Sequence, residues 1–165
     1  MLLPVSKKPR KRLPISGDAS PAGYKPMGLV YAEIELISGD DLVLHRRGFL
    51  SQERIKRLKV NALVDSGAYM LVINQHIKEQ LDLPVLDEQT ARLADESEIR
   101  VEVVGPIEIR FQNRRATVDA MVFSGDAEVL LGAIPMEDMD VLIDLKQRRL
   151  IVNPENPYIA RKSVK

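Results

Sequence analysis

One aspartate of this 165-residue chain stands where an apolar run meets a turn of small residues, within residues 62–68, ALVDSGA. A carboxylate that leaves a buried strand loses hydration, so hydrogen bonds, a second titrating group or a metal must stabilise its charge. Ser66 can supply a hydroxyl, and Gly67 lets the backbone bring an N–H close to the carboxylate. The chain is apolar again at residues 70–73. Asp65 is therefore expected to be presented rigidly at the tip of a loop between two buried segments.

A second stretch, residues 129–135 (VLLGAIP), places large apolar residues before a glycine. The order and chemistry of the two stretches resemble the retropepsin-like, or retroviral-type, aspartic proteases, and most closely the short bacterial members of that family. Asp-Ser-Gly alone also occurs in ordinary turns, so the second stretch is needed for the resemblance. The resemblance covers about residues 28–153 and implies an aspartic-type endopeptidase that hydrolyses peptides or proteins.

The resemblance also assigns roles to individual residues. It implies that Asp65 holds the nucleophilic water, that Ser66 braces the catalytic loops, and that Gly67 lets a backbone N–H reach the carboxylate. Gly132 would let its backbone pack closely behind the catalytic turn. The resemblance implies that substrate lies extended between the floor of the site and a hairpin within residues 89–104, the flap. The expected catalytic residues are Asp65, Ser66 and Gly67, and the expected substrate-binding residues are Ala68, Ala94, Asp95, Glu96, Ser97 and Gly132.

Members of the family commonly have a glycine in the flap turn. This chain departs from that pattern, since it has Asp95-Glu96-Ser97 there. The turn must therefore be one that ordinary residues can adopt. The acidic side chains at the tip suggest the hypothesis that basic substrates are preferred.

Peptide hydrolysis by carboxylates requires a pair, one ionised to take a proton from water and one protonated to polarise the carbonyl. The sequence holds no second Asp-Ser-Gly or Asp-Thr-Gly. A two-fold homodimer would place Asp65 against its own symmetry mate, and the two carboxylates would share one proton. The alternative is a catalytically inactive dimer of the same fold that binds peptides or proteins.

Composition restricts the other classes of function. The chain has no cysteine, which excludes disulfides and thiolate metal sites and agrees with a cytoplasmic location. No metal or cofactor is expected, because neither His45 nor His76 belongs to a ligand pattern. No apolar run approaches the roughly 20 residues of a membrane span, so no membrane partner is expected. Nucleic acid is not an expected partner either, because residues 27–165 carry 18 lysines and arginines against 23 acidic residues.

The charge and proline distribution divides the chain. Residues 1–26 carry six lysines and arginines against one aspartate, a net charge of +5, together with five prolines. This composition predicts a disordered basic tail. The alternative is that translation starts at Met27, in which case residues 1–26 are not part of the native protein. Residues 27–153 are expected to form the single folded domain and residues 154–165 a mobile C-terminal tail.

Alternating apolar residues predict a mostly β, barrel-like domain with one or two short helices. Asn74 is expected to cap a helix that ends before Pro84, and Pro135 suits the first turn of a second helix. Strands are expected at 29–36, 42–44, 55–64, in two segments of 89–104, in a hairpin over 107–123, and at 141–145 and 150–152.

Overall fold

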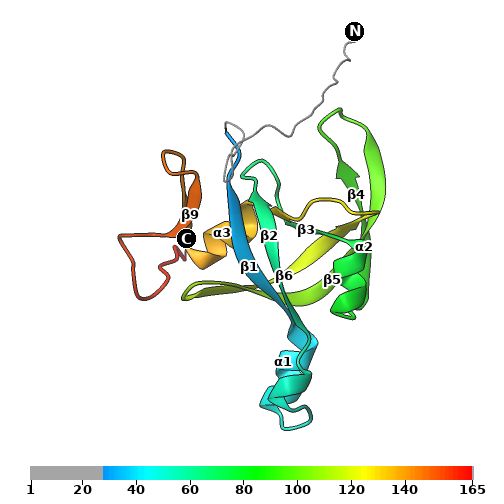
Figure 1. Ribbon diagram of the computed structural model, residues 1–165. Coiled ribbons are helices and arrows are strands. Elements are labelled where there is room, and N and C mark those ends of the chain that lie inside the picture. Colours follow the sequence, from blue (N-terminus) through cyan, green and yellow to red (C-terminus); the bar gives the residue numbers. More distant parts are fainter. Residues whose placement is uncertain (1–27, 165) are drawn as a thin grey trace, which may run out of the picture.

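The computed structural model describes residues 28–164, and the predicted disordered tail, residues 1–26, lies outside them. Seven strands form one sheet and two more form a separate hairpin (Figure 1). The expectation of a mostly β, single-domain barrel is confirmed. The strands are β1 (Tyr31–Ser38), β2 (Arg57–Val64), β3 (Leu71–Asn74), β4 (Val85–Arg92), β5 (Glu98–Phe111), β6 (Arg114–Phe123), β7 (Leu130–Leu131), β8 (Val141–Asp144) and β9 (Arg149–Val152).

The large sheet closes on itself. Its strand order is β1-β2-β7-β3-β6-β5-β4, and an additional pairing of β1 with β5 joins the two sides into a six-stranded barrel that leaves β4 outside. Most neighbours are antiparallel, whereas β2–β7 and β3–β6 are parallel. β4 and the outer part of β5 form a long hairpin that rises from the barrel, residues 85–104, called the flap hairpin below (Figure 1).

The core is almost entirely aliphatic: the sequence has no tryptophan, and Phe111 is an aromatic member of the main buried cluster. Alternate residues of β1 point inward, and the largest of them, Ile34 and Leu36, are at most 1% exposed. Ile107 and Ile109 of β5 are fully buried in the same cluster. The two-residue period of these strands therefore places one apolar face in the barrel.

Three α-helices lie within the described residues: α1 (Gly39–Arg46), α2 (Gln75–Gln80) and α3 (Ala133–Met139). The Asn74 cap is confirmed, because its Oδ1 accepts a hydrogen bond of 2.9 Å from the Ile77 N–H. α3 begins directly after Gly132 and contains Pro135 in its first turn, also as expected.

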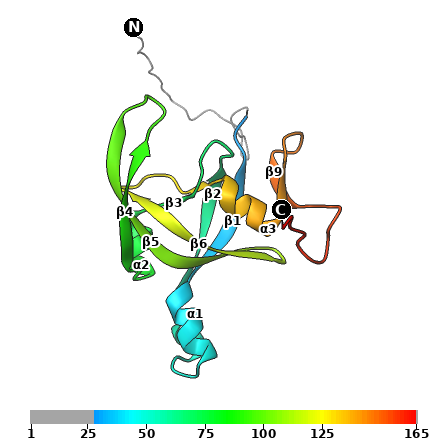
Figure 2. The ribbon, with the colours of Figure 1, turned by 180° about the vertical axis from the view of Figure 1, so that it is seen from behind.

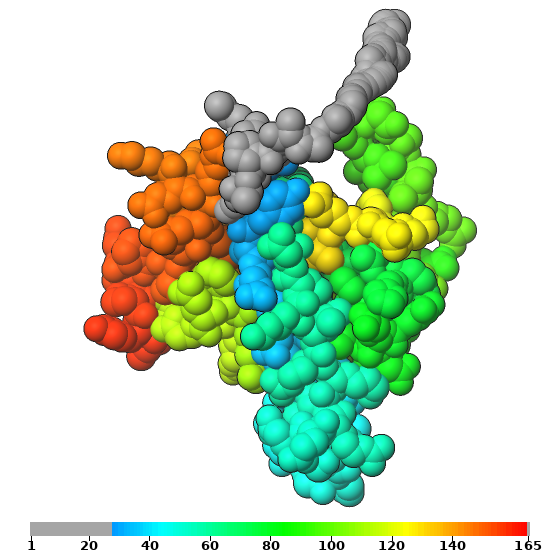
Figure 3. All heavy atoms as spheres, in the orientation of Figure 1, coloured from blue at the N-terminus to red at the C-terminus, as the bar shows by residue number. Residues whose placement is uncertain are grey.

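The strand expected at 42–44 is wrong, because those residues belong to α1. Ser38 caps this helix by accepting a bond from the Asp41 N–H, and the Asp41 carboxylate accepts bonds from the Lys56 N–H (2.9 Å) and Nζ (3.1 Å). These contacts, together with the short 3-10 helix η2 (Gln52–Arg54), fold residues 39–56 into a knob. Figures 2 and 3 show the knob at the end of the barrel opposite the tip of the flap hairpin.

Among the described strands, β8 and β9 pair only with each other, so they form a second sheet and do not extend the first. Residues 153–164 form no helix or strand, but they contact the domain: the Asp140 carboxylate accepts bonds from the Asn156 side chain and the Arg161 N–H. Mobility of residues 154–165 stays a prediction. Among residues 28–164, no helix is both long and apolar enough to cross a membrane.

Candidate active site

The turn after β2 holds Asp65 through backbone contacts. The Asp65 N–H donates to the Leu131 carbonyl of β7 (3.0 Å), and the Asp65 carbonyl accepts a bond from the Ala68 N–H (3.1 Å). The Gly67 N–H donates to Oδ1 of Asp65 at 2.9 Å, which is the carboxylate contact expected from the sequence. Asp65 is half-buried, and Ser66 and Gly67 are exposed. The carboxylate is thus oriented by the protein while it stays open to solvent.

Gly132 lies directly behind this turn. A Cβ added to Gly132 would stand 2.3 Å from the Met70 carbonyl oxygen and 2.8 Å from that of Ala68, distances at which no side chain fits. The first N–H groups of α3 point to the same segment: Ala133 donates to Ala68 O (2.9 Å) and Ile134 to Tyr69 O (3.0 Å). The two motifs, far apart in the sequence, therefore form one backbone unit.

A cleft of about 610 Å³ lies between the turn and the flap hairpin. Asp65, Gly67 and Ala68 line one side, and residues 90–94 of the flap hairpin line the other. Among residues 28–164, β4 has a strand partner on one side only, so the flap contributes an edge strand to the sheet. An extended peptide can pair with such an edge.

The tip of the flap hairpin is built without glycine. Glu96 adopts a left-handed conformation with a φ of 70°, the strained choice that the missing glycine imposes. Asp95 accepts bonds from the Ser97 hydroxyl (2.5 Å) and N–H (2.9 Å). These bonds favour the charged carboxylate, so they lower the pKa of Asp95.

The structure brings together only some of the expected site residues. Ala94 lines the cleft, whereas Asp95, Glu96 and Ser97 stand at the exposed tip and are not among its lining residues. Ser66 does not line the cleft either, and Gly132 supports the turn from behind. The assigned roles of all these residues stay predictions.

Sequence reasoning missed the apolar floor of the cleft. Met121 and Phe123 alternate with buried Ala120 and Val122 along β6, so they lie on the other face of that strand. In a sequence, a strand that is apolar on both faces indicates that both faces make contacts. The apolar lining residues outside both motifs and the apolar run 70–73, and not singled out from the sequence, are Tyr69, Ala91, Leu93, Met121 and Phe123.

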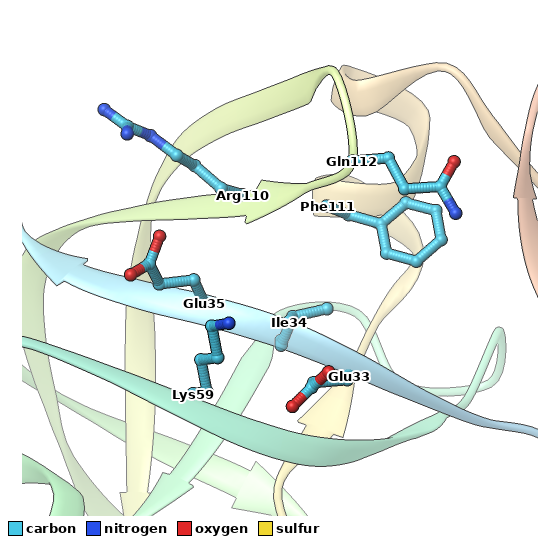
Figure 4. Close-up of a pocket in the computed structure, with 7 residues that line it drawn as sticks. All are labelled: Glu33, Ile34, Glu35, Lys59, Arg110, Phe111 and Gln112. Atoms are coloured by element: carbon cyan, nitrogen blue, oxygen red, sulfur yellow. The ribbon is translucent and has the colours of Figure 1, made fainter.

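Another hollow, of about 440 Å³, lies over β1, β2 and β5 and includes no residue of the Asp65 turn (Figure 4). Its carboxylates and cations come from neighbouring strands, and Glu35 pairs with Arg57 at 3.5 Å.

Residues 28–164 contain no group of three or more histidine, aspartate and glutamate side chains that could hold a metal ion.

Residues 52–136 match the protein family described as "gag-polyprotein putative aspartyl protease". The match covers more than half of the chain and includes the Asp65 turn, the flap hairpin and Gly132. No curated protein matches the chain.

Proposed function

The chain belongs to the retropepsin-like aspartyl protease family, and on this premise we propose that it is an aspartic-type endopeptidase. Its active site is proposed to form in a cytoplasmic homodimer, in which the Asp65 carboxylates of two identical subunits face each other. The observation that carries the proposal is the position of Asp65: it opens onto a cleft whose other side is lined by residues 90–94, at the end of the edge strand β4 and in the flap turn.

The chemistry follows from the paired carboxylates. One ionised Asp65 accepts a proton from water as the water oxygen bonds to the scissile carbonyl carbon. The protonated Asp65 of the other subunit donates to the carbonyl oxygen, because two close carboxylates share one proton and titrate together. The Asp65 that took the proton from water then donates it to the amide nitrogen, the other Asp65 takes a proton back from a hydroxyl of the tetrahedral intermediate, and the C–N bond breaks to leave a carboxylic acid and an amine. No covalent bond to the enzyme forms.

The hydrogen bond from the Gly67 N–H supports this mechanism, because it fixes the rotation of the Asp65 carboxylate. Because the donor is backbone, its direction is set by the turn and needs no reorganisation during the reaction.

Exposed apolar side chains beside the turn support the homodimer. Tyr69 is 73% and Ile134 39% exposed, and the Ile134 N–H donates to the Tyr69 carbonyl, so the two residues are adjacent. A second copy that covers this patch would bury apolar surface and bring a second Asp65 close to the first.

The test compares wild type with Asp65→Asn on a mixed peptide library between about pH 4 and 7. Asp40→Asn, on α1 at the other end of the barrel, is the matched control. We expect cleavage by wild type and the control, a loss of at least about 10³-fold in Asp65→Asn, and a dimeric native mass. A folded protein that cleaves nothing contradicts the proposal and leaves the peptide-binding module as the function to test.

A further inference from the structure

The first described residues leave the barrel next to the catalytic turn. The Val30 carbonyl accepts a 2.8 Å hydrogen bond from the N–H of Val64, the residue directly before Asp65. Val30 is also 2% exposed, so this point of the chain is fixed in the core. The sequence N-terminal to it therefore starts beside the cleft. At roughly 3.3 Å per extended residue, a segment of some 20 residues can reach any part of the cleft.

The flap hairpin is strongly acidic. Residues 85–104 carry six carboxylates against two arginines, a net charge of −4. The two arginines are engaged, Arg92 with Glu98 at 3.9 Å and Arg100 with Glu88 at 2.5 Å. Within residues 28–164, no lysine or arginine pairs with Asp95 or Glu96 at the tip. The tip thus presents unpaired negative charge at the rim of the cleft.

The N-terminal segment has the opposite charge and the matching apolar content. Residues 7–12, KKPRKR, hold five cations within six positions, and Leu13 and Ile15 follow closely. The cleft floor offers Met121, Phe123 and their apolar neighbours to such side chains. Pro9 and Pro14 favour extended backbone in the residues before them, which suits a ligand lying beside a strand edge.

We propose that residues 7–15 of this chain occupy the cleft between the Asp65 turn and the flap hairpin, where they compete with substrate. The basic run 7–12 contacts the acidic flap tip, and Leu13 and Ile15 cover the apolar floor. The inference rests on the proposed function in that it gives the same cleft a second, regulatory occupant. Because the contact is largely between exposed charges, salt weakens it.

The experiment exploits the absence of tryptophan from the chain. Leu13→Trp in the full-length Asp65→Asn protein supplies a single indole, whose emission shifts to the blue when it leaves water. We expect a blue shift relative to a synthetic peptide of residues 1–26 with the same tryptophan. About 1 M salt, at which the Debye length is about 3 Å, should abolish the shift. An excess of unlabelled 1–26 peptide should reverse it.

The charge variants decide where the segment binds. Asp95→Asn/Glu96→Gln removes two negative charges from the flap tip and should abolish the blue shift. Asp87→Asn/Glu88→Gln removes two negative charges from the other end of the flap hairpin and should leave the blue shift in place. The inference is overturned if the full-length protein emits at the same wavelength as the free peptide. It is also overturned if the blue shift decreases equally in both charge variants. Because this readout needs no hydrolysis, a wild type without peptidase activity would refute the proposed function and leave this result standing.

Discussion

Gly132→Ala tests whether the two motifs act as one unit. The new Cβ would lie 2.3 Å from the Met70 carbonyl oxygen, and real Cβ contacts essentially never fall below 3.0 Å. The obstacle is backbone, so no side-chain rotation relieves it. Either the catalytic turn or the start of α3 must move by about 0.7 Å or more, the displacement that restores a 3.0 Å contact.

Two magnitudes follow from this displacement. Overpacking of a well-packed site costs about 1–3 kcal/mol of unfolding free energy. A shift of about 1 Å in a catalytic group lowers the rate about 10²-fold, because the bound geometry is no longer productive. Peptidase activity should therefore fall much more than stability alone accounts for, since a loss of this size leaves most molecules folded.

Urea unfolding and peptide hydrolysis of the same preparations measure both quantities. Gly48→Ala is the control: Gly48 has a φ of 83°, so alanine is strained there, but no heavy atom beyond the two chain neighbours lies within 4 Å of the added Cβ. This loop belongs to the knob at the far end of the barrel, so the control should lose stability and retain activity. Wild-type stability and activity in Gly132→Ala would refute the close packing of Gly132 behind the turn.

Three further substitutions test other parts of the fold. Asn74→Ala removes the cap of α2 and the 3.0 Å bond to the Ala127 carbonyl, and it should cost about 1–2 kcal/mol in urea unfolding; an unchanged midpoint would contradict the cap. Glu96→Gly relieves the left-handed backbone strain at the flap tip, but glycine also raises the entropy of the unfolded chain. The net increase in the free energy of unfolding should be roughly 0.5 kcal/mol in urea unfolding, and a decrease would contradict the strain. Hydrogen bonds from Asn153, Arg161 and Asn156 lower the pKa of Asp140 from 3.8, so its stabilisation is complete above that value and disappears as pH falls through the lower folded-state pKa. Thermal melts between about pH 5 and 2 should show a smaller acid-induced loss for Asp140→Asn than for wild type, and parallel curves would exclude the contribution.

Local patterns predicted most of the strands and the Asn74 cap because the information lies in consecutive residues. The alternation of β1 and β5 identifies a buried face without knowledge of the partner strand. The Asn74 cap likewise needs only the N–H of Ile77, three residues away. The turn at Asp65 could be placed for the same reason.

Features that depend on distant contacts could not be read in this way. The segment Ser38 to Asp41 contains residues common to turns and to helix starts, and the choice of helix depends on Asp41 meeting Lys56. The floor of the cleft depends on the parallel pairing of β3 with β6, which sets the face that Met121 presents. Neither pairing leaves a signal within a short window of sequence.

The bond from the Asp65 N–H to Leu131 has a consequence for synthesis of the chain. At roughly 5–20 residues per second, β7 is made several seconds after the aspartate it anchors. Until then Leu63 and Val64 have no β7 partner, and the loop to be closed spans the flap hairpin and β6. The turn that carries the carboxylate is therefore completed only when most of the domain has emerged, so an incomplete chain at the ribosome has no assembled catalytic turn.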